Sequence, residues 1–322
     1  MRATVTVPIL NSSQYLKDCV QCLSDQTFRD FEIIFVVDDR TDDGSLEMVK
    51  ELCAGMENVR IVIQTERTGL AGARNIGIDN ADGDLIWFLD VDDHPFPTFL
   101  EEIVSILDDK DADIVFCNHF EYCKRIVPEI PEHDYQAKMI DKESALSNFI
   151  ELPVYSWSRI QKKKIFDDGR ARFIQRPAAE DIEQTIRSIA VAERICYYDK
   201  PLYVYYKSDN TAVKRNRSKE IESLESTARS LMSFFDGSNI QADDTFKGHL
   251  AERIMRQSAF ASYKEFSRSY KDSYAHTLIR SLKERTREMK VYEFSKLLYY
   301  LALYRFTHGK WDKKEGLWKE LE

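Results

Sequence analysis

The sequence predicts an α/β fold in which a doubly wound, mostly parallel sheet carries helices on both faces, with a helical C-terminal region after it. Two patterns predict this fold. Short apolar runs alternate with amphipathic, helix-length segments over residues 1–120. Carboxylates also follow two of these runs directly, most clearly in GDLIWFLDVDDHPFP at residues 83–97, where the run ends at Asp90, Asp92 and Asp93. Such a run suits a strand buried on both faces, and ligands bind at the carboxyl ends of parallel strands.

The elements follow one another with short connections. The expected strands are residues 4–9, 31–37, 59–64, 85–89 and 113–117, and the expected helices are 13–25, 45–53, 70–80 and 98–108. Ser12 or Ser13 is expected to cap the first helix. The turn before it, PILNSS, contains no glycine. Because Rossmann and Walker phosphate loops require glycine for close backbone approach, we expect neither.

The composition is that of an ordinary soluble protein with room for about two domains, since the 322 residues are 43% hydrophobic and 31% charged. No stretch has the roughly 18 consecutive apolar residues of a membrane span, and the N-terminus lacks the apolar core of a signal peptide. We therefore expect a cytoplasmic protein. Six cysteines do not suggest a disulfide framework, and the C-x-x-C of Cys19 and Cys22 has no second pair to complete a zinc site.

The net charge of -9 is distributed unevenly. Residues 213–322 hold 22 Lys and Arg against 16 Asp and Glu, which leaves a charge of -15 for residues 1–212. A domain with so negative a balance is a poor partner for a nucleic-acid backbone, because such binding depends on clustered cations. We expect no nucleic-acid partner.

The carboxylates at the two strand ends suggest a ligand site. Hard oxygen ligands clustered at Asp90 and Asp92 suit Mg²⁺ or Mn²⁺, ions that commonly hold a diphosphate. A solvated acidic turn or a helix cap is the alternative reading of this cluster. The pair Asp38 and Asp39 ends the strand at 31–37 in the same way, and its alternative role is to cap the following loop.

Three segments in this order carry a resemblance to a known family. They are PILN, then QTFRDFEIIFVVDDRTDDGS, then GLAGARNIGIDNADGDLIWFLDVDD. Together they resemble the family 2 glycosyltransferases of the GT-A fold, enzymes that use nucleotide-activated sugars. The resemblance is dense over residues 1–120 and continues in patches to about residue 210, through AED at 179–181 and YVYYK at 203–207.

The resemblance implies a domain organisation. Residues 1–212 would form the GT-A domain, with a nucleotide-sugar-binding half at 1–120 and an acceptor-side half at 121–212. Residues 213–322 would form a helical C-terminal region.

The resemblance also implies roles on the donor side. Asp39, next to Asp38, would accept the uracil N3 hydrogen and so select uridine. The nucleotide would further be contacted by residues of the PILN and ARN segments, namely Pro8, Asn11, Arg74 and Asn75. Asp90 would contact the ribose or the metal shell, Asp92 would be the metal ligand, and Asp93 would orient the loop. The cofactor would be Mn²⁺ or Mg²⁺, which neutralises the charge on the departing diphosphate.

On the acceptor side the resemblance implies a general base. Glu180 and Asp181 match the family's ED pair, in which the aspartate is the base, and Glu180 is its rival. Asp181 falls in the first turn of an expected helix, where the ionised carboxylate is favoured. Trp157 offers a face on which a sugar ring could stack, and a core role for it is the alternative.

Three departures from the family pattern stand out. Arg40 replaces a common glycine, so it either fills a conformation that glycine would relax or supplies a cation near the donor. Thr68 replaces the first glycine of a usual pair. A histidine that often follows YYR as a metal ligand is missing, so we expect Lys207 to meet the diphosphate and Asp209 to be the candidate third ligand.

The C-terminal region is expected to hold helices at 219–235, 246–266, 270–289 and 291–306. The last is apolar over most of its circumference and must be buried against something. Packing on neighbouring helices, a homodimer interface and peripheral contact with the inner face of the membrane stay open.

The sequence therefore predicts an inverting, metal-dependent glycosyltransferase that moves a sugar from a UDP-sugar to a glycan or lipid-linked acceptor in surface polysaccharide or glycoconjugate synthesis. A catalytically silent sugar-nucleotide-binding protein is the alternative, because the histidine is missing. A sugar nucleotidyltransferase lacks its Gly-rich basic loop here, and a metal phosphatase lacks its early DxDx[TV].

Overall fold

The structure, a computed structural model, describes residues 1–147, 152–176 and 180–207, together with eight positions between 223 and 235. All of them belong to the first of two compact units, Met1–Ser262. The helices expected at 246–266, 270–289 and 291–306 lie outside the described residues, as does Asp209. Of the helix expected at 219–235, the eight described positions are helical. The domain boundary at 212 and the role of the last helix stay predictions.

The described elements alternate as the sequence predicts. The strands are β1 (Ala3–Ile9), β2 (Phe31–Asp38), β3 (Val59–Gln64), β4 (Leu85–Phe88), β5 (His94–Pro95), β6 (Ile114–Tyr122), β7 (Ala137–Ile140), β8 (Arg159–Lys162) and β9 (Ile195–Tyr206). The α-helices are α1 (Ser13–Ser24), α2 (Ser45–Leu52), α3 (Gly69–Asn80), α4 (Phe99–Asp109), α5 (Lys142–Ser147) and α6 (Glu180–Val191), and two 3₁₀ turns, Ser156–Ser158 and Lys163–Phe166, flank β8.

One sheet contains all the strands, in the order β3-β2-β1-β4-β8-β6-β9-β5, and β7 pairs with β9. β1 pairs in parallel with β2 and β4, and β2 pairs in parallel with β3. β8 runs antiparallel to both β4 and β6, so β6 and its parallel partner β9 point the same way as β4. The sheet is therefore mostly parallel, and the carboxyl ends of six strands meet at one edge.

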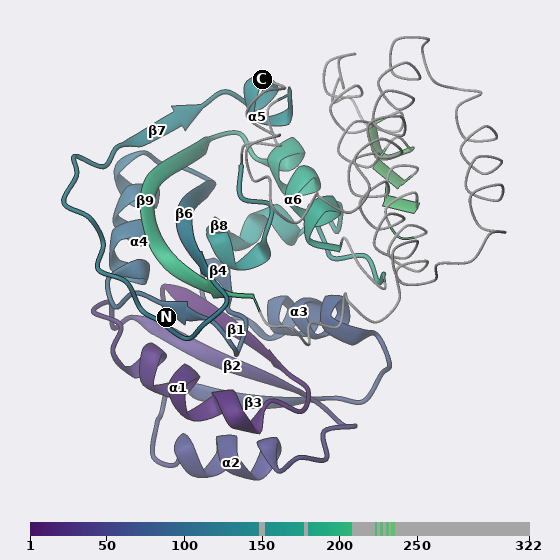
Figure 1. Ribbon diagram of the computed structural model, residues 1–322. Helices are drawn as coiled ribbons and strands as arrows, with labels where there is room; N and C mark the ends of the chain where they lie inside the picture. Colours follow the sequence, from purple (N-terminus) through teal and green to yellow (C-terminus); the bar gives the residue numbers. More distant parts are fainter. Residues whose placement is uncertain are drawn as a thin grey trace, which may run out of the picture. The chain divides into compact units, whose positions relative to one another are not determined.

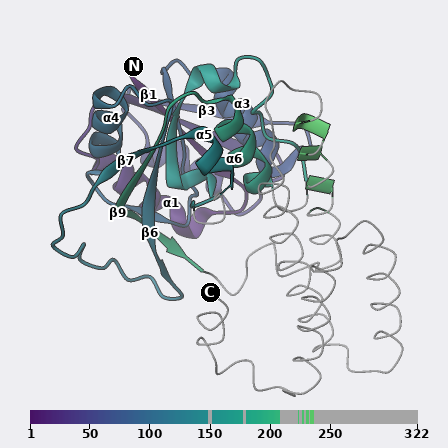
Figure 2. The ribbon, with the colours of Figure 1, turned by 90° about the horizontal axis from the view of Figure 1, so that it is seen from above.

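Helices cover both faces of this sheet, as predicted. Alternate residues of β1, β2 and β4 contribute to a core with α1, α2 and α4, while the intervening residues of β2 and β4 pack with α3, α5 and α6. Figure 1 shows α1 and α2 below β1–β3 and α3 above them, and in Figure 2 α5 and α6 lie on the near side of the strands. Side chains that alternate along a strand produce this two-sided burial.

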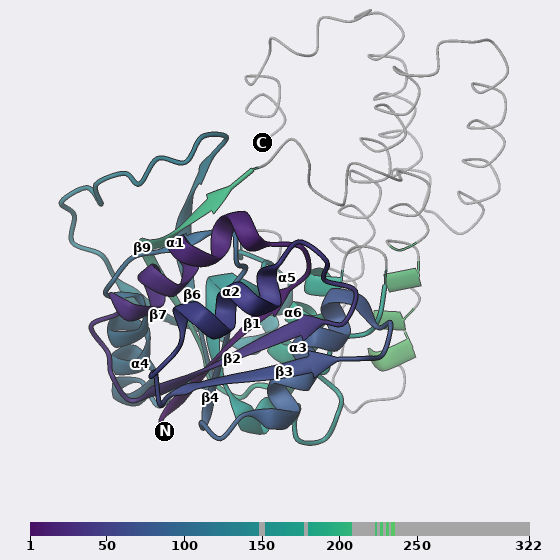
Figure 3. The same ribbon diagram turned by 90° about the horizontal axis from the view of Figure 1, so that it is seen from below.

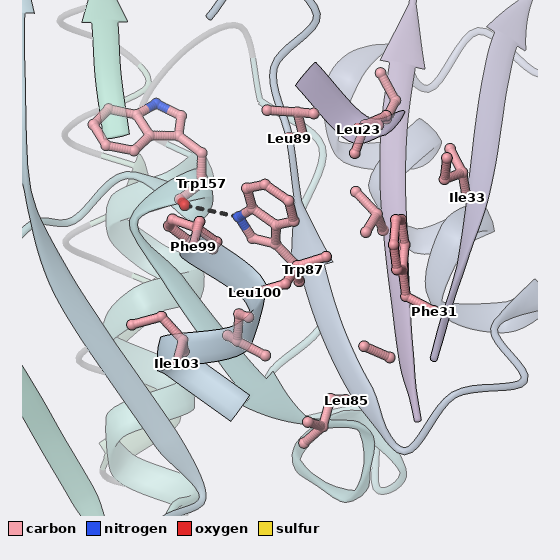
Figure 4. Close-up of a cluster of buried hydrophobic side chains, with 14 of the residues drawn as sticks. Leu23, Phe31, Ile33, Leu85, Trp87, Leu89, Phe99, Leu100, Ile103 and Trp157 are labelled. Carbon is pink, nitrogen blue, oxygen red and sulfur yellow. Dashed lines mark hydrogen bonds between the residues drawn. The ribbon is translucent and has the colours of Figure 1, made fainter. Parts of the chain in front are cut away.

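The larger core is centred on Trp87 in β4 (Figure 4). Its ring stacks on Phe99 of α4 with centroids 4.3 Å apart, and its indole N–H donates to the Trp157 carbonyl at 3.0 Å. A buried indole N–H must find an acceptor, and this bond ties β4 to the 3₁₀ turn before β8. The strand that leads to Asp90 is thereby fixed from both sides.

Two local predictions require correction. The N-terminus of α1 is capped by Asp43, which accepts from the Ser13 amide at 2.8 Å, while neither Ser12 nor Ser13 supplies the side-chain bond. β6 continues beyond its expected end at Cys117 to Tyr122, through a register shift at Cys117, Asn118 and His119. The segment between β6 and β7 then extends away from the sheet (Figure 3).

Two further observations concern the cysteines and the length of the helices. All six cysteines are described and free, and five of them are buried. Within the described residues, no helix is both long enough and apolar enough to span a membrane.

Candidate active site

Arg74 of α3 organises the carboxyl edge of the sheet. Its side chain is completely buried, and it donates from one terminal nitrogen to Asp181 Oδ1 at 2.5 Å and from the other to Asp90 Oδ1 at 2.9 Å. Glu180 lies 3.9 Å from the first nitrogen. A guanidinium suits this role because its planar fork of donors can serve two acceptors at once. Arg74 thus links the carboxylate at the end of β4 to the predicted base at the start of α6.

Asp181 is held through one of its two oxygens. Ser156 donates to Oδ1 at 2.5 Å, the same oxygen that Arg74 contacts. No hydrogen bond to Oδ2 occurs among the described residues, and the side chain is 22% exposed. A carboxylate fixed at one oxygen and open at the other is oriented and can still accept a proton.

Helix α6, which carries Asp181, is itself anchored by a buried acid. Glu183 is 1% exposed and accepts from Arg176 at 2.7 Å and from Arg187 at 2.9 Å. Ser230 also donates to it, at 2.5 Å. Breaking such a buried, fully bonded charge cluster is strongly destabilising, so the start of α6 is positioned firmly.

The carboxylates around Arg74 differ in how readily they ionise. Burial raises the pKa of Glu180 to about 7, and the neighbouring Asp181 adds to the rise. Burial also raises the pKa of Asp90, although the Arg74 guanidinium opposes it. Burial raises the pKa of Asp92 to about 6, with Asp90 contributing. Carboxylates that are crowded together and partly desolvated mark a functional site.

The acidic cluster after β4 consists of carboxylates, the type of ligand that Mg²⁺ and Mn²⁺ prefer. Among the described residues, the only cation paired with Asp90, Asp92 or Asp93 is Arg74 on Asp90. No three acidic, Cys or His groups in this part of the chain form a closed cage. Mg²⁺ commonly takes one or two carboxylates and fills its shell with phosphate oxygens and water. Asp92 and Asp90 fit that mode.

Asp93 has a structural role, in agreement with the expectation that it orients the loop. It is 2% exposed and accepts from the Tyr206 amide and the Tyr203 hydroxyl, each at 3.0 Å. These bonds fix the loop after β4 against β9.

Two of the predicted nucleotide-binding residues, Asp38 and Asp39, lie at the end of β2 and differ in exposure. Asp38 is buried and binds Arg40 through the Arg40 amide at 3.0 Å and Nε at 2.6 Å, and this pairing lowers the Asp38 pKa. Asp39 is exposed beside it. Arg40 therefore neutralises Asp38, and its backbone does not have the positive φ that would favour glycine.

The loop after β1 is shaped by Asn11. This residue has a φ of 50°, a left-handed conformation that asparagine tolerates better than most residues. Its side-chain oxygen accepts from the Asp42 amide at 2.9 Å, which ties the PILN turn to the loop after Asp39. Pro8 lies in β1 opposite Val36. The structure therefore brings Pro8, Asn11 and Asp39 to one end of the sheet.

Three residues predicted to contact a ligand have other partners in the structure. Asn75 bonds the Phe173 backbone in both directions, at 2.9 and 3.1 Å, so its amide holds that segment, and its contact with a nucleotide stays a prediction. Lys207 is paired with Glu121, so its charge is already matched. Trp157 is 1% exposed, which supports the core alternative and corrects the predicted stacking of a sugar on its ring.

Sequence reasoning missed several residues that complete the site. Ser156 orients Asp181. The ring centroid of Phe173 lies 5.3 Å from the guanidinium carbon of Arg74. Arg159 is buried, donates to the Tyr155 carbonyl at 2.8 Å and also contacts Gln184. Their partners are 25 or more positions away, except for Tyr155, so only the fold reveals them. Alternating Tyr203 and Tyr205 in YVYYK was the one local signal of an aromatic cluster.

A mostly parallel sheet with helices on both faces, a DxD cluster after β4 and an acidic pair at the start of α6 is the arrangement of a glycosyltransferase of the GT-A type. The family model described as "Glycosyl transferase family 2" matches residues 4–182. The chain belongs to glycosyltransferase family 2.

Curated relatives agree with this assignment. The chain is 30% identical over 228 residues to the putative glycosyltransferase EpsH of Bacillus subtilis, covering 68% of this chain and 65% of EpsH. It is 28% identical over 214 residues to glycosyltransferase GlyA of Streptococcus pneumoniae, covering 63% of this chain and 30% of GlyA. The chain thus spans less than a third of GlyA and just under two thirds of EpsH.

A solved structure shares the fold. TarS residues 1–349 of S. aureus, in complex with UDP-GlcNAc, superimpose with a TM-score of 0.66 at 22% identity, covering 84% of this chain and 76% of that one.

Proposed function

We propose that this enzyme is an inverting, metal-dependent glycosyltransferase that transfers a sugar from a UDP-sugar to a glycan or lipid-linked acceptor. The observation that carries the proposal is the Arg74 bridge between Asp90 and Asp181. It holds Asp90, a proposed leaving-group carboxylate, and Asp181, the proposed base, on one buried guanidinium. This arrangement supports single displacement, in which a base takes the acceptor proton while a separate group stabilises the leaving group.

Asp181 Oδ2 is the proposed proton acceptor. As the acceptor oxygen attacks the anomeric carbon, its proton passes to Oδ2, the bond to the diphosphate oxygen breaks, and the nucleoside diphosphate departs with the electron pair. Arg74 and Ser156 hold Oδ1 throughout and stop the carboxylate from rotating. Glu180 lies 3.9 Å from Arg74, is less firmly oriented than Asp181 and is the weaker candidate.

Asp92 and Asp90 would hold Mn²⁺ or Mg²⁺, which when bound supplies positive charge to the departing diphosphate. Asp39, exposed at the end of β2, is the proposed reader of uracil. The neighbour bound to UDP-GlcNAc supports a UDP donor. Lys207 remains a candidate for the diphosphate only if it exchanges Glu121 for the ligand.

A role in surface glycan synthesis is also part of the proposal, and the name of one relative supports it. TarS is named as a poly(ribitol-phosphate) beta-N-acetylglucosaminyltransferase and is 25% identical over 208 residues. Its name describes addition of a sugar to a polymer. We extend only the general class, sugar transfer to a cell-surface glycan or its lipid-linked precursor, to this chain.

A thermal-shift experiment tests the donor site. UDP should raise the melting temperature only with Mn²⁺ or Mg²⁺ present, by an amount that grows with UDP concentration as ligand linkage requires. Asp92→Asn should abolish the metal-dependent part, while the exposed Asp109→Asn serves as the matched control. An equal shift with GDP would contradict the role of Asp39, and a full shift without metal would contradict that of Asp92.

The raised pKa of Glu180 predicts a pH-dependent stability. Because the folded state holds this proton up to about pH 7 and the unfolded chain releases it near 4.5, the wild type should lose stability as pH rises between these values. Glu180→Gln removes that loss, so relative to wild type it should gain about 2–3 kcal/mol of unfolding free energy between pH 5 and pH 8. Urea unfolding at both values measures this, with exposed Glu57→Gln as the control. No pH-dependent difference between Glu180→Gln and wild type would contradict the prediction.

A further inference from the structure

Next to the proposed base lies a stack of four aromatic rings. Tyr155, Trp157 and Tyr203 are nearly parallel, with centroids 4.8 Å and 4.3 Å apart and interplanar angles of 5° and 3°. Tyr205 leans against Tyr155 and Trp157, with its centroid 5.4 Å from each. Trp157 and Tyr203 are fully buried, whereas Tyr155 and Tyr205 are half-buried. The stack therefore has a fixed base in the core and an outer surface made by two tyrosines.

The outer tyrosines lie between the two halves of the reaction site. Tyr155 immediately precedes Ser156, which binds Asp181. Tyr205 is in β9 opposite Glu121 of β6, at the edge where β4 ends in its aspartates. Burial raises the Tyr205 pKa, and Tyr155 and the three aspartates after β4 add to the rise, which is consistent with this placement. A molecule resting on the two rings would be close to the proposed base.

The described polar side chains around these rings have a net charge of zero or below. Lys207 is paired with Glu121. His119 meets Tyr155 and Trp157 edge-on, and burial lowers its pKa, so it is uncharged near neutral pH. Its Nδ1 is buried and has no hydrogen-bond partner among the residues that the structure describes. Arg125 is engaged elsewhere, with Asp18, Tyr15 and Tyr206. A phosphate-rich chain would find no unpaired cation here among the described residues and would face the aspartates.

We infer that Tyr155 and Tyr205 form the acceptor subsite and that its ligand is an uncharged pyranose ring, not a polyol phosphate. The apolar C–H face of the ring would lie on the tyrosines, and its hydroxyls would bond Glu121 and Lys207, as in sites that join aromatic walls to a few placed polar groups. This inference rests on the proposed function and names the substrate class of its acceptor side. It distinguishes this chain from TarS, whose name specifies poly(ribitol-phosphate).

The test measures binding directly. With UDP and Mn²⁺ present, saturation-transfer NMR on the full chain would use methyl glucoside, methyl galactoside and methyl N-acetylglucosaminide as neutral probes, and ribitol phosphate as the anionic probe. Saturating protein aromatic protons should transfer to the ring protons of at least one pyranoside and not to ribitol phosphate. Tyr205→Leu and Tyr155→Leu should each weaken that pyranoside about tenfold, because the stacking face is lost.

Two further variants keep the result interpretable. Tyr205→Phe retains the ring and should bind like wild type. Tyr122→Leu removes a tyrosine from the neighbouring position of β6, one residue from Glu121, and is the matched control. Absence of pyranoside binding, unchanged binding in both leucine variants, or preference for ribitol phosphate would each overturn the inference. The UDP thermal shift on the same samples tests the donor site separately, so its failure would overturn the proposed function while leaving the acceptor result readable.

Discussion

Asp181→Asn should lower sugar transfer by about a hundredfold or more and leave UDP affinity nearly unchanged. The structure explains why the variant should fold. An asparagine oxygen can take the place of Oδ1 and accept from Arg74 and Ser156, while the amide nitrogen occupies the place of Oδ2. The amide cannot take the acceptor proton. The measurement is transfer from a UDP-sugar to the best acceptor of the pyranoside panel, with the nucleotide affinity determined in parallel.

Two comparisons sharpen this prediction. Glu180→Gln should reduce transfer less than Asp181→Asn, because Glu180 lies 3.9 Å from Arg74 and is the less firmly oriented of the pair. Asp109→Asn, on the exposed end of α4, should have no effect. Near wild-type transfer by Asp181→Asn would remove Asp181 as the base. A product that keeps the anomeric configuration of the donor, seen by NMR, would exclude single displacement altogether.

The parts of the fold that sequence predicts well are those set by local patterns. The strand at residues 59–64 and the helix ending at Asn80 were bounded correctly, because apolar periodicity and flanking turn residues determine them. β6 was underestimated because Asn118, His119 and Glu121 interrupt its apolar run. Its register shift lets the strand continue with polar side chains at the edge where the site lies.

The candidate site was predicted as a set of residues but not as an arrangement. The DxD cluster and the ED pair can be recognised one by one, whereas the bond from Arg74 to Asp181 joins positions 107 residues apart. Likewise, an apolar pattern cannot tell whether Trp157 faces the core or a ligand, because both environments favour an aromatic ring. The burial of Trp157 in the structure decides for the core.

Arg74→Met should destabilise the protein by about 3–5 kcal/mol, because it leaves buried carboxylates without their cation. The surface pair Arg172 and Asp79 gives a matched control: Arg172 is 31% exposed, and Arg172→Met should cost no more than about 1 kcal/mol. Arg74→Lys keeps the charge but loses the fork that reaches both Asp90 and Asp181. Arg74→Lys should be more stable than Arg74→Met and should still transfer sugar slowly. This result would distinguish the effect of the lost contact with both carboxylates from the effect of the lost positive charge.

The pH dependence of the Arg74→Met penalty follows from the groups that Arg74 contacts. Burial raises the pKa of Asp90 and takes that of Glu180 to about 7, so both accept protons more readily than ordinary carboxyls once the cation is gone. A protonated carboxyl no longer requires a cationic partner. The destabilisation by Arg74→Met, measured by urea unfolding, should therefore be smaller at pH 5 than at pH 8. The destabilisation by Arg172→Met should be small at both pH values. A penalty for Arg74→Met that is equal at the two values would mean that lost packing against Phe173, not the unpaired carboxylates, accounts for the loss.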